Sequence, residues 1–89
     1  MIAQREVTIV NSLGFHVRPA TDFAEQASKF RSRIHVIQGN QEFDAKSSID
    51  LLLMAAVQGT KLTIRAEGDD AREAVETLAR MVEAGFGET

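Results

Sequence analysis

One stretch of the sequence has residue types and spacing suited to phosphoryl chemistry, Gly14-Phe15-His16-Val17-Arg18-Pro19-Ala20. The pattern that follows predicts a helix, and Pro19 suits its first turn because the missing N–H has no intrahelical partner there. His16 then stands at the N-cap, at the positive end of the helix dipole and beside free backbone N–H groups. Arg18 can offer a planar guanidinium to phosphoryl oxygens.

An imidazole in this position is a candidate phosphoryl acceptor. Neutral imidazole is a nucleophile, and its ordinary pKa of about 6.5 leaves it mostly neutral near pH 7. The alternative is that His16 is only a turn residue and Arg18 only a solvated charge. Residue types and spacing leave both interpretations open, and the second is the more common outcome for such patterns.

Length and composition limit the class of protein. A chain of 89 residues has room for one domain, taken here as residues 1–89, with one thin two-layer core. The absence of cysteine excludes a disulfide framework, a thiolate metal site and a Cys nucleophile. The net charge of −3 argues against nucleic acid as a partner. The N-terminus lacks the pattern of a signal peptide and the longest apolar run, residues 51–57, is too short to span a membrane, so we expect a cytoplasmic protein with no membrane contact.

Hydrophobic periodicity predicts four strands and three helices in the order β-α-β-β-α-β-α. The expected strands span residues 6–10, 33–37, 41–44 and 61–67. The expected helices span residue 17 to about residue 29, residues 47–58, and residue 69 or 70 to Gly85. Because the strands have half-polar faces, the helices should cover one face of an antiparallel or mixed sheet, which is an open-faced α+β sandwich. The expected apolar layer includes Phe23, Ala27, Leu52 and Leu78.

Several acidic residues have positions typical of helix caps. Ser47-Ser48-Ile49-Asp50 has the Ser-x-x-acid form in which Ser47 caps a helix, and Asp70 with Glu73 predicts a second capping box. These acids are therefore interpreted as capping residues, and we expect neither a metal nor a cofactor. His35 is interpreted as a solvated strand residue.

The apolar run at Leu51-Leu52-Leu53-Met54 cannot face the core along its whole length if it is helical. One or two of its side chains should be exposed. Such exposure favours a protein-docking patch beside His16.

The segment Asn-Ser-Leu-Gly-Phe-His-Val-Arg-Pro-Ala at 11–20 resembles the active-site signature of HPr, the histidine-containing phosphocarrier of the bacterial phosphoenolpyruvate-dependent phosphotransferase system (PTS). The length, the element order, Ala45-Lys46-Ser47-Ser48-Ile49 and the Gly-Phe-Gly-Glu ending are also similar to that family. The resemblance covers essentially the whole chain and favours the phosphoryl interpretation. It implies a four-stranded antiparallel sheet covered on one face by three helices.

The resemblance also implies residue roles. His16 would take a phosphoryl group on Nδ1 from phosphorylated enzyme I and pass it to an EIIA protein or domain, and Arg18 would steady that group. Ser47 matches the regulatory serine of an HPr kinase/phosphorylase, and Ser12 could add a hydroxyl donor. The expected protein is a cytoplasmic, monomeric phosphoprotein of sugar transport or its regulation. It would be a phosphohistidine carrier rather than an independent enzyme.

Some residues depart from the family pattern. Phe15 and Val17 replace other apolar residues beside the histidine, and we expect both at an exposed rim. Ser48 and Asp50 stand where relatives have an apolar residue and a glycine. This change affects the expected docking of partners and of the serine kinase, but it leaves the histidine chemistry intact.

Four alternatives are weighed beside the sugar-branch carrier. The first two are a regulatory relative that acts through Ser47 and a carrier of a nitrogen or regulatory branch. A third is a small hydrolase of the acylphosphatase kind, which would need a helix-borne Arg in a glycine-containing cradle and an Asn that positions water. The loop carries His16 beside the helix instead, which argues against it. The fourth is a ligand-binding α+β module without phosphoryl chemistry.

Overall fold

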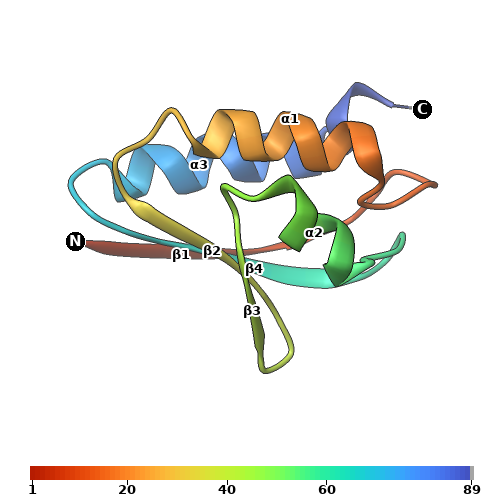
Figure 1. Ribbon diagram of the computed structural model, residues 1–89, viewed down its shortest axis with the longest axis horizontal. Coiled ribbons are helices and arrows are strands. Elements are labelled where there is room, and N and C mark those ends of the chain that lie inside the picture. The colour runs from red at the N-terminus through yellow and green to blue at the C-terminus, as the bar shows by residue number, and fades with distance from the viewer. Residues whose placement is uncertain (89) are drawn as a thin grey trace.

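The computed structural model of the chain describes residues 1–88, and its elements follow the predicted order (Figure 1). The strands are β1 (Ile2–Thr8), β2 (Arg33–Gln38), β3 (Gln41–Asp44) and β4 (Lys61–Glu67). The helices are α1 (Val17–Ala27), α2 (Ser48–Met54) and α3 (Ala71–Glu83), and a short 3-10 helix, η1 (Gly85–Gly87), follows α3.

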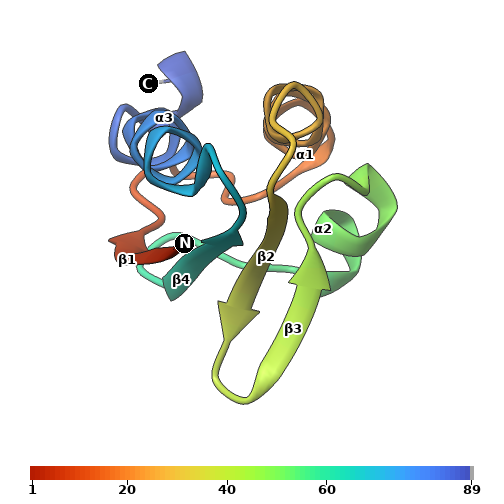
Figure 2. The same ribbon diagram turned by 90° about the vertical axis from the view of Figure 1, so that its left-hand side faces the viewer.

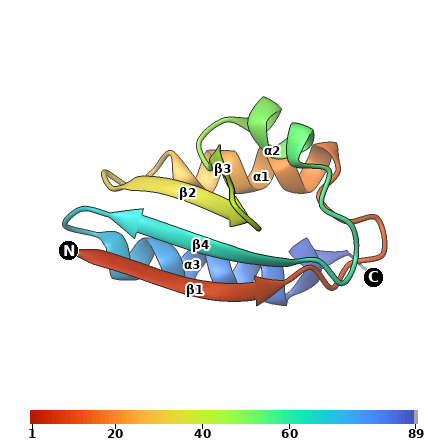
Figure 3. The same cartoon turned by 90° about the horizontal axis from the view of Figure 1, so that it is seen from below.

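The four strands form one sheet in the order β1-β4-β2-β3, and every neighbouring pair is antiparallel. Helices α1 and α3 lie side by side over one face of this sheet, and α2 lies beside α1 near β3 (Figure 2). The opposite face is open (Figure 3). The predicted open-faced α+β sandwich is therefore confirmed. Within residues 1–88 no helix is long and apolar enough to cross a membrane.

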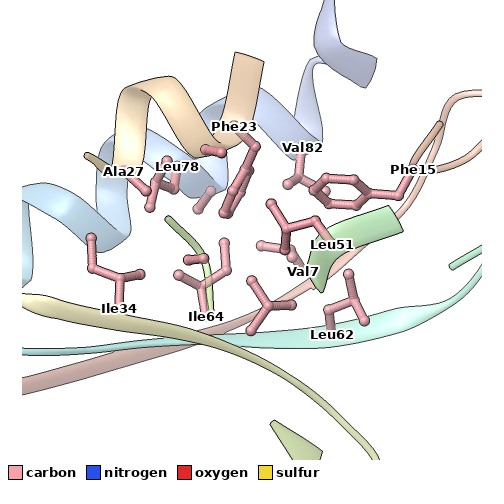
Figure 4. Packing of buried hydrophobic residues seen from close by; sticks show 14 of the residues in the cluster. Val7, Phe15, Phe23, Ala27, Ile34, Leu51, Leu62, Ile64, Leu78 and Val82 are labelled. Atoms are coloured by element: carbon pink, nitrogen blue, oxygen red, sulfur yellow. The ribbon is translucent and has the colours of Figure 1, made fainter. Parts of the chain in front are cut away.

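One apolar layer fills the space between the sheet and the helices (Figure 4). The helices contribute Phe23, Leu51 and Leu78, and β4 contributes Leu62 and Ile64, all of them almost fully buried. Burial of each such side chain contributes about 1.5–3 kcal/mol.

The prediction for Leu52 is wrong, because its side chain is 37% exposed and its neighbour Leu51 is buried instead. The turn of α2 directs Leu51 and Met54 inward, since positions three apart share a helix face.

Helix α2 is shorter than predicted. It ends at Met54 because Ala55 has left-handed backbone angles (φ 52°, ψ 39°), and a residue in this conformation ends a helix. The chain then turns so that Ala56 is buried and its carbonyl accepts a hydrogen bond from the Phe15 N–H (2.9 Å). Gly59, the residue that follows the predicted helix, lies in the turn before β4.

Strand β1 also differs from its predicted bounds. It begins at Ile2, which pairs with Glu67 of β4, and it ends at Thr8. The sequence did not predict residues 2–5 as strand, because apolar and polar side chains alternate only weakly there. Such weak alternation is compatible with β1, since it lies at the edge of the sheet. Ile9 is buried beyond the strand, where its N–H donates to the Thr60 carbonyl (2.9 Å).

Asp70 does not form the predicted capping box with Glu73, since its side chain makes no cap hydrogen bond to α3. Its carboxylate instead accepts from the Arg31 N–H (2.8 Å), the Ser32 N–H (3.0 Å) and the Ser32 hydroxyl. These bonds, the Ser32 hydroxyl first among them, lower the pKa of Asp70 to about 2. Asp70 therefore ties the segment before β2 to the start of α3.

The low pKa of Asp70 predicts a pH-dependent contribution to stability. The contribution is present above the unfolded-state value of about 3.9 and is lost as the pH falls through about 2. We expect the free energy of unfolding to fall less steeply between pH 5 and pH 2 in Asp70→Asn than in the wild type. Urea unfolding at several pH values measures this slope. Asp69→Asn, at an exposed neighbouring position, should keep the wild-type slope, and equal slopes in all three proteins would refute the assignment.

Gly14 positions the loop before α1. Its φ of +67° favours glycine, and a Cβ added there would lie 2.4 Å from the Ala56 carbonyl oxygen. Gly14→Ala should therefore lower the free energy of unfolding by about 2 kcal/mol or more.

Gly39→Ala is the matched control for this substitution, because Gly39 has a similar φ of +62° and no atom within 4 Å of an added Cβ. It should cost only the backbone strain of about 1–2 kcal/mol. Equal losses in the two variants, measured by urea unfolding, would show that the contact with Ala56 is unimportant.

Candidate functional site

His16 lies at the N-cap of α1, as predicted, and its carbonyl accepts the first helical hydrogen bond, from the Ala20 N–H (2.9 Å). The preceding residue anchors it. The Phe15 ring packs edge-on against Phe23 (5.4 Å between ring centres) and Phe86 (5.2 Å). The expectation that Phe15 lies at an exposed rim is therefore wrong, since the turn at Gly14 directs its ring into the core.

The His16 ring contacts the end of the chain. Its Nε2 lies 2.7 Å from Oε2 of Glu88, and the two side chains are 35% and 17% exposed. His16 makes no side-chain cap hydrogen bond to α1. This arrangement follows from the fold, because the C-terminus lies at the same end of the molecule as the start of α1 (Figure 1).

Arg18 uses its guanidinium on protein groups. Its Nε donates to Glu88 Oε2 (3.2 Å), and its Nη2 lies 2.9 Å from the same oxygen. Nη2 also donates to the Phe86 carbonyl (2.8 Å), and Nη1 donates to Asp22 Oδ2 (3.0 Å). Arg18 is thus beside His16 as predicted, and each of its three guanidinium nitrogens already contacts a protein group.

Three side chains contact the Glu88 carboxyl group. Burial of its carboxyl raises its pKa, but hydrogen bonds from Asn11, His16 and Arg18 outweigh burial, so the net pKa lies below its ordinary value. The group is therefore an ionised carboxylate at neutral pH, and it can only accept hydrogen bonds.

Asn11 joins the loop before α1 to the C-terminal segment. Its side chain is buried, and Nδ2 donates to the Gly14 carbonyl (2.7 Å) and to Glu88 Oε1 (2.9 Å). These two acceptors determine the orientation of the amide. Its Oδ1 is buried without a hydrogen-bond partner within the described chain, which is a cost that the Glu88 contact helps to offset.

The other candidate residues lie apart from this cluster. Ser12 is exposed in the loop before His16. Ser47 caps α2 as predicted, because its Oγ accepts from the Asp50 N–H (3.2 Å). His35 points to the open face of the sheet, opposite the buried side of β2. Residues 1–88 contain no group of three or more side chains placed to hold a metal ion.

Three residues of the site were not predicted from the sequence: Asn11, Asp22 and Glu88. Asn11 was named only as part of the family-like segment 11–20, and Glu88 only as part of the family-like ending. No local pattern joins Glu88 to His16, because 72 positions separate them. The acid at position 22, four residues after Arg18, was the one available signal, since such a pair shares a helix face.

Comparisons with known proteins identify the family of the chain. The model of the family described as the PTS HPr component phosphorylation site matches residues 3–84. The phosphocarrier protein HPr of Haemophilus influenzae is 42% identical over 78 residues, covering 88% of this chain and 92% of the relative. The phosphocarrier protein NPr of Shewanella violacea is 38% identical over 85 residues, covering 96% and 93%.

A solved structure is also similar. The crystal structure of an HPr from Thermoanaerobacter tengcongensis superposes with a TM-score of 0.93 at 38% identity, covering 98% of each chain. Family, relatives and structure thus agree over nearly the whole chain. The chain belongs to the HPr family of phosphocarrier proteins of the PTS, which implies PTS partners such as enzyme I and EIIA.

Proposed function

We propose that His16 is the residue on which this phosphocarrier takes up and releases the phosphoryl group. The donor is phosphorylated enzyme I and the acceptor is an EIIA protein or domain. The observation that carries the proposal is the position of the His16 ring, at the N-cap of an eleven-residue helix, partly exposed and beside Arg18. The family is defined by a phosphorylation site, and His16 lies within its matched residues.

In the transfer step one bond to phosphorus forms while another breaks. The ring nitrogen Nδ1 of His16 forms a bond to phosphorus, and the bond between phosphorus and the leaving atom of enzyme I breaks. Backbone N–H groups in the first turn of α1 face the bound phosphoryl group and stabilise its negative charge. The reverse exchange then passes the group to EIIA.

In this proposal Arg18 changes partners during transfer. In the structure its donors bind Glu88, Asp22 and the Phe86 carbonyl. A phosphoryl group on His16 adds about two negative charges within reach of the same guanidinium. Arg18 therefore turns some of its guanidinium N–H groups toward the phosphoryl oxygens and stabilises the group, since bidentate arginine–phosphate contacts are strong.

An exposed apolar surface beside His16 supports protein docking. Helix α2 exposes Ile49 and Leu53, while Leu51 is buried. Leu13 and Val17, on either side of His16 in the chain, are also exposed. We define Leu13, Val17, Ile49 and Leu53 as the docking surface, and we propose that enzyme I and EIIA bind there in turn.

Ser47 is a second proposed phosphorylation site, and it is regulatory. Its hydroxyl is half-buried at the N-cap of α2, where added charge would alter the edge of the docking surface. Asp50 opposes this reaction by like charge, because it follows Ser47 by three residues and its N–H already donates to Ser47 Oγ. An acid-stable adduct formed with ATP and an HPr kinase, and absent from Ser47→Ala, would establish the site. A wild type that stays unlabelled would exclude it.

We also propose that residues 1–89 act as one domain, as a cytoplasmic monomer. The single apolar cluster within residues 1–88 supports the one-domain assignment, and one cooperative unfolding transition tests it. An HPr from T. tengcongensis has been solved as a dimer, so light scattering of the purified chain must test the monomer. Fractionation of cells tests the compartment.

The branch of the PTS in which the chain acts can be tested by the rate at which different enzymes I phosphorylate it. Relatives named HPr and NPr have similar identity to this chain. We propose the sugar branch, with the nitrogen branch as the alternative. Faster phosphorylation by the enzyme I of a sugar PTS than by that of a nitrogen branch supports this choice, and the opposite order reverses it.

The central prediction concerns the mass of the protein after incubation with phosphoenolpyruvate, Mg²⁺ and enzyme I. We expect one phosphoryl adduct that is lost in acid and survives alkali, as is typical of phosphohistidine. The adduct should be absent from His16→Ala. In Arg18→Ala it should form more slowly, by a factor of about 10–100, because a charge-assisted contact is lost.

His35→Ala is the matched control for this experiment, because it removes the other histidine from the open face of the sheet. It should be labelled like the wild type. Labelling of His16→Ala, or loss of labelling in His35→Ala, would move the site away from His16.

A further prediction tests the docking surface. Leu53→Ser should raise the KM of enzyme I for this protein by up to about tenfold, because its side chain is 73% exposed and available to a partner. Stability should change little. Ile2→Ser replaces an exposed apolar residue at the far end of β1, and its KM should match the wild type. Equal KM values for all three proteins would place the docking surface elsewhere.

A further inference from the structure

The contact between His16 and Glu88 determines more than the position of the ring. An Nε2 to Oε2 distance of 2.7 Å is a hydrogen bond, so one of the two atoms carries the proton. Glu88 also accepts from the Asn11 amide and the Arg18 guanidinium, and these two donors stabilise the ionised form of its carboxyl group at neutral pH. The proton therefore belongs to His16 Nε2.

A neutral imidazole has one protonated nitrogen and one with a free lone pair. If Nε2 carries the proton, the lone pair is on Nδ1. Only a nitrogen with a lone pair can attack phosphorus, so the hydrogen bond to Glu88 selects which ring atom becomes the acceptor.

We propose that Glu88 is a positioning residue that keeps the proton of neutral His16 on Nε2 and leaves Nδ1 as the phosphoryl acceptor. This inference rests on the proposed function of His16 and deepens it. Glu88 touches His16 and Arg18 and never the phosphorus atom, so its effect passes through these two side chains.

Charge balance extends the role of Glu88 to the phosphorylated state. When Nδ1 bonds to phosphorus, the ring keeps its proton on Nε2 and gains a positive charge. The Glu88 carboxylate lies against that N–H and offsets the charge. Its side chain is 17% exposed and that of His16 is 35% exposed, so solvent screens the pair in part. When the group leaves for the acceptor, the electron pair of the N–P bond returns to Nδ1 and the ring is neutral again.

Asn11 holds the carboxylate in place for this task. Its amide bridges the Gly14 carbonyl and Glu88 Oε1, which leaves Oε2 to face His16 and Arg18. The two oxygens of Glu88 thus have separate partners. A carboxylate held at both oxygens keeps its orientation better than one held at a single oxygen.

The test is the ¹⁵N spectrum of the His16 ring, recorded above the pH at which the ring becomes neutral. In the wild type, Nδ1 should show the shift of an unprotonated ring nitrogen and Nε2 that of a protonated one. Glu88→Ala should move both shifts toward intermediate values, since both tautomers are then populated. Glu88→Gln should restore the wild-type pattern in part, because its amide oxygen still accepts a hydrogen bond.

Rates and a control accompany the spectra. We expect Glu88→Ala to lower the kcat/KM of phosphorylation by enzyme I about tenfold. Glu76→Gln, at an exposed position of α3, should match the wild type in both measurements. Ring shifts in Glu88→Ala that equal those of the wild type would overturn the proposal. A wild type that no enzyme I phosphorylates would refute the function proposed for His16, while the ring spectra would still decide the role of Glu88.

Discussion

The arrangement of the molecule depends on one apolar layer, which lies between the helices and a single face of the sheet. Four antiparallel strands and three helices share this layer, and the opposite face of the sheet stays open (Figure 3). Residues 1–88 form one buried apolar cluster, and a domain of about this size buries too little surface to enclose a substrate as well. Reactive groups must therefore lie at the rim of the layer, where helices begin and the chain ends. His16 lies there, at the start of α1.

The same layer holds the site in place from below. Phe15 places its ring in the core between Phe23 and Phe86, so the residue before His16 and a residue near the C-terminus are packed against each other. This contact brings Glu88 to His16. The buried aromatic rings thus determine where the polar side chains around His16 lie. These polar side chains are held in defined positions although they are partly exposed.

One negative charge has several partners in the polar cluster. A single carboxylate, Glu88, serves the amide of Asn11, the ring of His16 and the guanidinium of Arg18. In the proposed function, an incoming phosphoryl group competes with this carboxylate for Arg18, so the contacts of Arg18 with Glu88 do not prevent the reaction. A carrier needs this balance, because a group that is held too tightly is not passed on.

Local patterns in the sequence were enough to predict the element order, the bounds of β3 and β4, the N-cap positions of His16 and Ser47, and the proximity of Arg18 to His16. Each depends on residues within a few positions of one another, where spacing and propensity act directly. Only the tertiary structure decided the early end of α2 at Ala55, the burial of Phe15 and the bonds of Asp70 to Ser32. It alone brought Glu88 to His16, because contacts between residues far apart in the chain arise from packing and leave no periodic trace in the sequence.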